Sequence, residues 1–174
     1  GRNFIEHLKT RHCIFAPGHR DLDLTNQQAV DQWFCDYKID LVVHCALKPG
    51  HRNAKDMTGL LDADLRMFFN LLRNVENRPS IRMFHIGSGS CYDMRHYIPR
   101  MTEGYFGMYI PVDDTGFAKY SISSVCMKSE NIYDLRVFGI FGKYEDYAIR
   151  FISNAICKNL MDLPITIRQN RVFS

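Results

Sequence analysis

The sequence predicts an α/β fold, a doubly wound parallel sheet with helices on both of its faces. Two observations support this prediction. Short apolar runs of strand length alternate along the chain with segments whose apolar residues recur at helical spacing, which is typical of parallel sheets. The run at 39–46 is nearly continuous and rich in β-branched residues, as expected of a strand that is buried on both faces.

The first part of the chain predicts a helix, a short strand and a second helix. Residues 2–10 place their apolar side chains on one face, and residues 13–16 form a short apolar run. Thr25 is followed three residues later by Gln28, which is the capping-box pattern of a helix N-terminus. We therefore expect the second helix to begin at Thr25.

The middle of the chain predicts two buried strands joined by a long helix. The strand at 39–46 leads through a loop to a helix over 57–77, in which inward-facing leucines and phenylalanines recur. The next strand, 81–86, runs directly into the sequence Gly-Ser-Gly-Ser at 87–90. Taken alone, that sequence is also typical of a flexible turn.

The last part of the chain continues the alternation. An irregular segment at 91–113 precedes a helix at 114–130 and a strand at 135–139. A helix at 147–160 and a final strand at 164–168 follow. With these elements the chain is expected to form one core between sheet and helices.

Composition and charge exclude several classes of function. The 174 residues, 46% hydrophobic and 24% charged, suffice for one ordinary globular domain. A net charge of +3 does not favour a nucleic-acid partner, and no apolar run approaches the ~20 residues of a membrane span. The six cysteines form no CxxC pair, and no spacing suits zinc. We expect reduced, buried thiols, no metal and a cytoplasmic location.

Both ends of the sequence differ from those of a complete doubly wound domain. Gly1 stands directly before the first helix, whereas such a domain opens on a strand and a glycine-rich turn. The other end stops inside an apparent strand at 171–174. We therefore expect a sheet that lacks its first strand, and a chain that lacks its C-terminal substrate part.

Five local motifs follow one another in the order found in a known family. They are Gly1 with the helix RNFIEHL, DLDLT at 21–25, VVHCA at 42–46, FHIGSGSCY at 84–92 and LRVFGIFG at 135–142. Together they resemble the extended short-chain dehydrogenase/reductase family, in its NAD-dependent epimerase/dehydratase branch. The resemblance implies that residues 1–174 are a single, partial NAD(P)-binding Rossmann-type domain, with the substrate-binding part beginning at about residue 143.

The resemblance also implies where a nicotinamide cofactor binds. His19 and Arg20 follow the second predicted strand, where a basic pair favours the 2′-phosphate of NADP over NAD. A solvated turn explains the same pair. The implied cofactor-binding residues are Gly1, His19, Arg20, Asp23, Leu24, Cys45, Ala46, Leu47, Lys119, Phe138 and Ile140.

The family's catalytic motif is YxxxK, in which a lysine one helical turn away lowers the pKa of the tyrosine that exchanges a proton with the substrate. The matching stretch here is Thr115-Gly-Phe-Ala-Lys119, so a threonine stands in place of the tyrosine. Ser88 matches the catalytic serine that also contacts substrate, and Ser90 a second active-site hydroxyl. Arg171 matches an arginine that binds the nucleotide diphosphate. Without the family, Thr115 is an ordinary helix N-terminal residue and Lys119 a solvated lysine.

Two functions follow from this match. The first is an NAD(P)-dependent epimerase, dehydratase or reductase that acts on a nucleotide sugar by transient hydride transfer at a sugar carbon. We expect it to be impaired in the given sequence by Thr115 and by the missing glycine-rich turn. The second is a non-catalytic domain of the same family that binds a cofactor or another protein. Ser90 and Tyr144 occupy the positions of the cysteine and histidine that GDP-fucose synthases use, so that particular activity is not supported.

The resemblance further implies a homodimer, because the family pairs two of its helices in a four-helix interface. The matching helices here are those at 57–77 and 114–130. The candidate contacts, which can equally face the sheet of a monomer, are Met67, Phe68, Ile122 and Met127.

Overall fold

The structure is a computed structural model that describes residues 1–50 and 54–167. The chain divides into two compact units. The first consists of Gly1 and Phe15–Phe138, and the second of Arg2–Ile14 and Gly139–Ser174. The first unit contains the sheet, the core and most of the predicted site residues.

The first unit is built on a three-stranded parallel sheet in the order β1-β2-β3. Its strands are β1 (Leu41–His44), β2 (Arg82–Ser88) and β3 (Ile132–Val137). His44 lies opposite His85, and Ser88 lies opposite Val137. The predicted α/β class with a parallel sheet is therefore confirmed.

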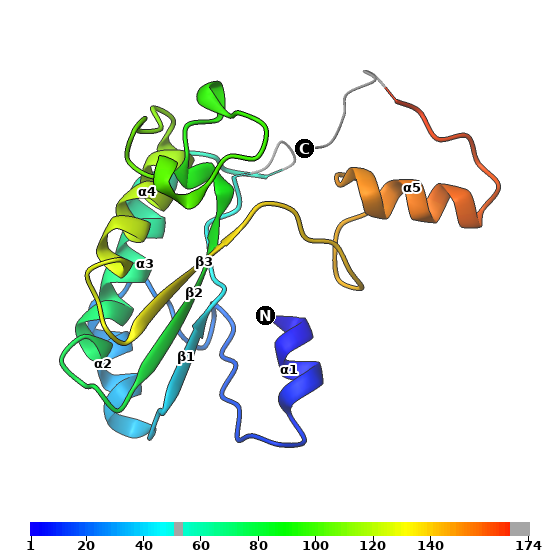
Figure 1. Ribbon diagram of the computed structural model, residues 1–174. Helices are drawn as coiled ribbons and strands as arrows, with labels where there is room; N and C mark the ends of the chain where they lie inside the picture. The colour runs from blue at the N-terminus through cyan, green and yellow to red at the C-terminus, as the bar shows by residue number, and fades with distance from the viewer. Residues whose placement is uncertain (51–53, 168–174) are drawn as a thin grey trace. The chain divides into compact units, whose positions relative to one another are not determined.

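Three helices of this unit pack together on one face of the sheet (Figure 1). They are α2 (Gln27–Asp36), α3 (Leu60–Val75) and α4 (Asp114–Cys126). The core between helices and sheet consists of Leu22, Val30, Phe34, Phe68, Leu71, Leu72, Val75, Ile81, Met83, Ile122, Cys126 and Ile132. Each such side chain contributes about 1.5–3 kcal/mol when it is fully buried.

This burial decides the role of the residues considered for dimer contacts. Phe68 and Ile122 are fully buried in the core, and Met67 is buried as well. They serve the interior of their own chain, whereas Met127 is 65% exposed. For three of the four residues the alternative therefore holds, in which they face the core of their own chain, and the dimer stays a prediction.

The N-cap of helix α2 lies one residue later than the capping-box pattern indicated, and the helix itself begins at Gln27. Its N-cap is Asn26, whose side-chain oxygen accepts a hydrogen bond from the backbone N–H of Ala29 at 3.2 Å. Thr25 does not cap the helix, because its hydroxyl donates to Asp23 Oδ1 at 2.7 Å. The Thr25 hydroxyl is thus bonded to the Asp23 carboxylate and not to the backbone of the helix.

Two of the predicted strands are absent from the sheet and a third is displaced. Residues 13–16 form no strand, and neither do 164–167, while residue 168 lies outside the described range. A strand requires a neighbour for its backbone N–H and C=O groups, and no described segment pairs with 13–16. β3 covers Ile132–Val137 rather than 135–139, because Ile132 belongs to the buried core.

The irregular segment predicted at 91–113 is a chain of loops with short 3₁₀ turns. Beyond β2 these are η1 (Gly89–Cys91), η2 (Met94–His96) and η3 (Glu103–Tyr105). Tyr97 donates its hydroxyl hydrogen to the carbonyl of Gly89 at 2.7 Å. That bond ties the segment back to the end of β2.

The second unit contains α1 (Arg2–Leu8) and α5 (Phe151–Leu160). Glu6 of α1 accepts hydrogen bonds from Lys143 Nζ at 2.6 Å and from the hydroxyl of Tyr144 at 2.9 Å. No helix in the described part of the chain is both long and apolar enough to cross a membrane.

The cysteines are all free, and their burial is more varied than expected. Cys91 and Cys126 are buried, whereas Cys13 and Cys35 are exposed. Burial raises the pKa of the Cys91 thiol to about 11 and that of Cys126 to about 12. Within residues 1–50 and 54–167, no three His, Cys, Asp or Glu side chains are grouped as a metal site requires.

Candidate active site

Ser88 and Ser90 lie at the carboxyl end of β2, the edge at which open parallel sheets bind ligands. Ser88 Oγ accepts hydrogen bonds from the backbone N–H of Ser90 at 3.2 Å and from the Ser90 hydroxyl at 3.0 Å. Gly89 is required between them, since a Cβ there would overlap the Phe138 ring. The Gly-Ser-Gly-Ser sequence is therefore a defined strand end and not a flexible turn.

The N-terminus of α4 packs against these serines. Asp113 caps the helix by accepting a hydrogen bond from the backbone N–H of Gly116 at 2.8 Å. A Cβ built on Gly116 would lie 3.1 Å from the carbonyl oxygen of Ser90. The neighbouring Thr115 thus stands in the first helical turn, close in the fold to the end of β2.

Polar side chains follow one face of α4 at intervals of four residues. Thr115 is exposed, whereas Lys119 is 7% exposed and Ser123 is fully buried. The spacing places all three on one side of the helix. The structure therefore puts the lysine of the predicted motif inside the protein, which excludes the alternative of a solvated lysine.

Lys119 is held by a carboxylate from α3. Its Nζ lies 3.3 Å from Asp64 Oδ2, and both side chains are almost entirely buried. Asp64 Oδ1 accepts a hydrogen bond from the backbone N–H of Lys48 at 2.8 Å. An ammonium has three N–H donors, and the described residues provide no partner for Lys119 besides Asp64. Two of its N–H donors are therefore without a partner among these residues.

Two histidines from neighbouring strands lie beside this ion pair. Nδ1 of His44 and Nδ1 of His85 are 3.0 Å apart, and both side chains are buried. Burial, followed by the charge of Lys119, lowers the pKa of His44 to about 4. Burial, His44 and Lys119 lower the pKa of His85 to about 2. Both rings are therefore neutral, with one Nδ1 donating to the other.

The polar row continues across β3. The Ser123 hydroxyl donates to Asp134 Oδ2 at 2.5 Å, and Arg136 Nε donates to Ser123 Oγ at 2.9 Å. A guanidinium nitrogen of Arg136 also donates to the hydroxyl of Tyr92 at 2.8 Å. We call the following side chains the buried polar cluster: His44, Asp64, His85, Lys119, Ser123 and Asp134.

Several residues predicted to contact the cofactor gather at the end of β1. Cys45, Ala46 and Leu47 follow the strand directly, and Leu47 is 53% exposed. A Cβ built on Gly1 would lie 3.9 Å from Cys45 Cβ, so this glycine stands against the strand end. Gly1 and Cys45 thus present only small groups at this edge of the sheet, where the family resemblance implies that a cofactor lies.

The segment predicted to read the ribose and adenine is a turn on the same unit. His19 Nδ1 lies 3.8 Å from Asp23 Oδ1, and both side chains are well exposed. Hydrogen bonds from Thr25 lower the pKa of Asp23. The carbonyl of Leu24 accepts a hydrogen bond from Asn70 of α3 at 2.8 Å, which fixes the turn. Arg20 is exposed.

Three predicted residues remain, namely Phe138, Ile140 and Arg171. Phe138 follows β3 and covers Gly89, so it belongs to the site region. Ile140 is 74% exposed and lies in the second unit. Arg171 lies outside the described residues.

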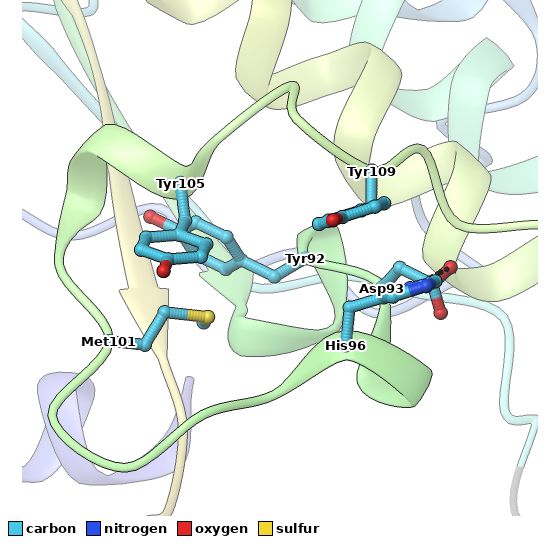
Figure 2. Close-up of a pocket in the computed structure, with 6 residues that line it drawn as sticks. All are labelled: Tyr92, Asp93, His96, Met101, Tyr105 and Tyr109. Atoms are coloured by element: carbon cyan, nitrogen blue, oxygen red, sulfur yellow. Dashed lines mark hydrogen bonds and ion pairs between the residues drawn. The ribbon is translucent and has the colours of Figure 1, made fainter.

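A shallow aromatic hollow lies in the segment after η1 (Figure 2). Its lining residues are Tyr92, Asp93, His96, Met101, Tyr105 and Tyr109. The His96 and Tyr109 rings stack on each other with centroids 3.9 Å apart, and hydrogen bonds from Arg95 lower the pKa of Asp93. The side chains that line the hollow are bonded to or stacked on one another, and these contacts stabilise the loop beside the serines.

Sequence reasoning missed Asp64 and His85, the partners of Lys119 and His44. Asp64 has a visible signal, because it interrupts the inward-facing stripe of α3 between Leu60 and Phe68. A charged residue at such a position is buried only when it is paired. His85 has a weaker signal, since it stands at a core position of a strand.

Several solved structures are similar in fold to this chain. A GDP-mannoheptose C4 reductase from Campylobacter jejuni with NADP bound has a TM-score of 0.78 and 22% identity over 91% of this chain. A GDP-L-fucose synthetase from Naegleria fowleri has a TM-score of 0.69 and 15% identity, and the match covers 90% of this chain. A dTDP-glucose 4,6-dehydratase from Bacillus anthracis in complex with NAD has a TM-score of 0.65 and 13% identity, and the match covers 95% of this chain. These identities establish the fold alone.

The chain spans about half the length of these structures, which are covered to 51%, 52% and 50% respectively. No curated protein matches the sequence. The model of the NAD dependent epimerase/dehydratase family matches residues 2–171, nearly the whole chain. With the serine strand end, the buried lysine and the parallel sheet already in place, this match is decisive: the chain belongs to the NAD dependent epimerase/dehydratase family.

Proposed function

We propose that this protein binds NADP and transfers hydride at a carbon of a nucleotide-activated sugar, with a proton-transfer step that Thr115 weakens. The observation that carries the proposal is the placement of Ser88 at the carboxyl end of β2 and of Lys119 in α4, which packs against it. The nucleotide-sugar enzymes that share the fold support this reading.

Lys119 and the end of β1 hold the cofactor in this proposal. The two uncommitted N–H donors of Lys119 bind the ribose hydroxyls, and the small surface formed by Gly1 and Cys45 lies against the cofactor backbone. The exposed basic groups of His19 and Arg20 favour the 2′-phosphate of NADP over NAD. The bound nicotinamide ring supplies the acceptor and donor of hydride.

Ser88 binds the reacting oxygen of the sugar. Its oxygen accepts both hydrogen bonds from Ser90, so its own hydroxyl hydrogen is free to be donated to the substrate. Thr115 occupies the place of the proton donor, and an aliphatic hydroxyl is a much weaker acid than a phenol. General acid/base catalysis contributes roughly 10²–10⁴-fold, so we expect turnover to be lower by that amount.

The proposed partners are a nucleotide sugar, whose diphosphate we assign to Arg171, and a second copy of the chain. The apolar surface of α3 and α4 offers Phe69, Phe117 and Met127, which are 39%, 40% and 65% exposed. Sedimentation at micromolar concentration tests the dimer, and a monomeric mass would exclude it.

A second candidate function is a cofactor-binding domain without catalysis. It is favoured by Thr115, which is exposed and makes no hydrogen bond through its side chain within the described residues. Cofactor binding is common to both candidates, and only turnover separates them.

The experiment is a titration with NADP and NAD, followed by turnover with a panel of GDP- and dTDP-sugars. Binding that is tighter for NADP, together with slow turnover of one sugar, supports the proposal. Binding without turnover of any sugar supports the non-catalytic domain. A protein that binds neither dinucleotide contradicts both candidates.

A further inference from the structure

We propose that Tyr97 is a catalytic residue that supplies a proton to the reacting oxygen of the sugar, and that it carries the turnover that remains with a threonine at position 115. The inference rests on the proposed function, because it takes Ser88 as the group that binds this oxygen. Tyr97 follows η2 in the loop segment 91–113, for which the sequence predicted no site residue.

The phenol of Tyr97 reaches the strand end that carries the two serines. Its hydroxyl donates a hydrogen bond to the carbonyl oxygen of Gly89 at 2.7 Å. Gly89 is joined in the chain to Ser88 on one side and to Ser90 on the other, and consecutive Cα atoms are about 3.8 Å apart. The structure therefore places a phenol beside the serine that we expect to bind the substrate.

The Tyr97 ring is held in place and still reached by water. Its centroid lies 6.3 Å from that of Phe138, whose ring lies against Gly89. The resemblance to the family implies that Phe138 contacts the cofactor. Tyr97 itself is 41% exposed, so water can return a proton to its hydroxyl after each turnover.

The hydrogen bond from Tyr97 to Gly89 can be given up without leaving a polar group unpaired. The Gly89 carbonyl also accepts a hydrogen bond from the backbone N–H of Tyr92 at 3.0 Å. A carbonyl that keeps one partner remains satisfied when the other leaves. The Tyr97 hydroxyl can therefore turn from the carbonyl to a substrate oxygen at little cost.

The other acidic groups of this segment are less suited to donate a proton. Tyr92 is 5% exposed, and its hydroxyl accepts a hydrogen bond from an arginine of β3. The Asp93 carboxylate is paired with Arg95, and burial raises the pKa of the Cys91 thiol to about 11. The Tyr97 hydrogen is bonded to a neutral carbonyl alone, so it is the one that a substrate can take most readily.

The protonation state of Tyr97 suits a donor. Burial raises the pKa of the Tyr97 phenol, and the charge of neighbouring groups such as Asp93 raises it further. The hydroxyl therefore keeps its hydrogen at neutral pH. A phenol with a raised pKa gives up its proton less readily than one that a lysine ammonium acidifies, which agrees with slow turnover.

The proposed step is the protonation of a sugar oxygen during reduction. The carbonyl carbon of the sugar gains hydride, with its electron pair, from the reduced nicotinamide of the proposed function. The π electron pair of the C=O bond moves to the oxygen, which forms an O–H bond as that of Tyr97 breaks. The Tyr97 phenolate then takes a proton from water.

The first variant is Tyr97→Phe, with Tyr109→Phe as the matched control. Tyr109 belongs to the same segment, is 44% exposed and stacks on His96. We expect single-turnover rates to fall roughly 10²-fold in Tyr97→Phe, the lower end of what general acid catalysis contributes, and to stay near the wild-type rate in the control. Both variants should melt close to wild type, because the Gly89 carbonyl keeps its backbone partner.

A double-mutant cycle with Thr115→Tyr separates proton donation from a structural role. In the Thr115→Tyr background a second phenol is present beside Lys119, so Tyr97→Phe should lower the rate by less than about threefold. A residue that only shapes the strand end would cause the same loss in both backgrounds. The cycle therefore tests the chemistry of Tyr97 and not its packing.

Fluorine NMR of protein that contains 3-fluorotyrosine gives a readout that needs no turnover. The resonance of residue 97 is assigned by its absence from Tyr97→Phe. We expect it to shift when GDP-mannose or dTDP-glucose binds, because the phenol leaves the Gly89 carbonyl for the sugar. A bound sugar that leaves this resonance unchanged overturns the role of Tyr97.

The remaining outcomes distinguish the inference from the proposed function. Wild-type rates in Tyr97→Phe, equal losses in both backgrounds, or turnover by Thr115→Tyr but not by wild type overturn the role of Tyr97 and leave the proposed function standing. Protein that binds neither dinucleotide, or that turns over no sugar even as Thr115→Tyr, overturns the proposed function and the inference with it.

Discussion

Two groups of side chains in the candidate site differ sharply in how they are held. The buried polar cluster of His44, Asp64, His85, Lys119, Ser123 and Asp134 lies between helices and sheet, with side chains that are at most 7% exposed. The second group consists of three residues with side-chain hydroxyls, Ser88, Ser90 and Thr115. They lie at the end of β2 and the start of α4, and Thr115 is exposed. The first group is held by a buried ion pair and hydrogen bonds, whereas the second consists of hydroxyls at the edge of the sheet.

The two groups also differ in how their side chains are bonded. In the buried polar cluster Lys119 has its counter-charge, and Ser123 is bonded both to Asp134 and to Arg136. In the second group Thr115 is exposed, and it stands where the resemblance to the family implies a tyrosine. Thr115 and Lys119 connect the two groups, because they stand one helical turn apart in α4.

The largest expected effect is on turnover and comes from Thr115→Tyr. The phenol restores a proton donor one turn from the Lys119 ammonium, so we expect turnover of a nucleotide sugar to rise roughly 10²–10⁴-fold, or about 3–5 kcal/mol in activation free energy. Affinity for NADP should change little, because Lys119 holds the ribose. Rates under single-turnover conditions measure the effect. Wild-type turnover at ordinary rates, without gain in the variant, would show that another residue carries the proton.

The next effect is on stability and comes from Lys119→Met. Removing the ammonium leaves Asp64 buried without its counter-charge, and breaking a buried pair costs about 3–5 kcal/mol. Lys48→Met is the control, since its ion pair with Asp56 is exposed and should cost about 1 kcal/mol or less. Urea unfolding of both variants measures the free energies. Equal losses would mean that the buried cluster is held no more firmly than the surface.

Local patterns predicted those parts of the molecule that depend on local sequence. The apolar runs around Val42 and Met83 identify buried parallel strands, and the Gly-Ser-Gly-Ser sequence with Lys119 locates two sides of the site. The strand predicted at 13–16 was wrong, because pairing depends on a neighbouring strand and not on the segment itself.

Long-range pairing explains what the sequence did not reveal. β3 was placed too late, since it begins at Ile132, and its residues Asp134 and Arg136 are bonded to Ser123 and Tyr92 from other parts of the chain. Asp64 and Lys119 are 55 residues apart, so no local spacing connects them. A buried polar residue can thus be predicted from the sequence where it interrupts an apolar stripe. Its partner can be identified only when the fold is known.

The third effect is a dependence of stability on pH that arises in the buried cluster. His44 and His85 have folded-state pKa values of about 4 and about 2, below the ~6.5 of an unfolded histidine. The unfolded state therefore binds more protons between these values. Their contribution is complete above pH ~6.5 and falls with decreasing pH, by at most about 1.4 kcal/mol per pH unit for each ring. Unfolding at pH 7, 6 and 5 measures the slope, and His85→Phe should reduce it. A flat profile in wild type would contradict neutral burial.

The smallest effect compares one serine from each group. Ser123 is fully buried and bonded to Asp134 and Arg136, so Ser123→Ala leaves buried polar partners unsatisfied and should cost about 1–3 kcal/mol. Ser90 is half-buried and donates one hydrogen bond to Ser88, so Ser90→Ala should cost about 1 kcal/mol or less. Affinity for NADP should survive both changes within a few-fold, because neither serine is a proposed ligand of the cofactor. Thermal unfolding measures the ranking. A larger loss for Ser90→Ala would reverse the comparison and place the structural weight of the site at the strand end, where we assign substrate binding.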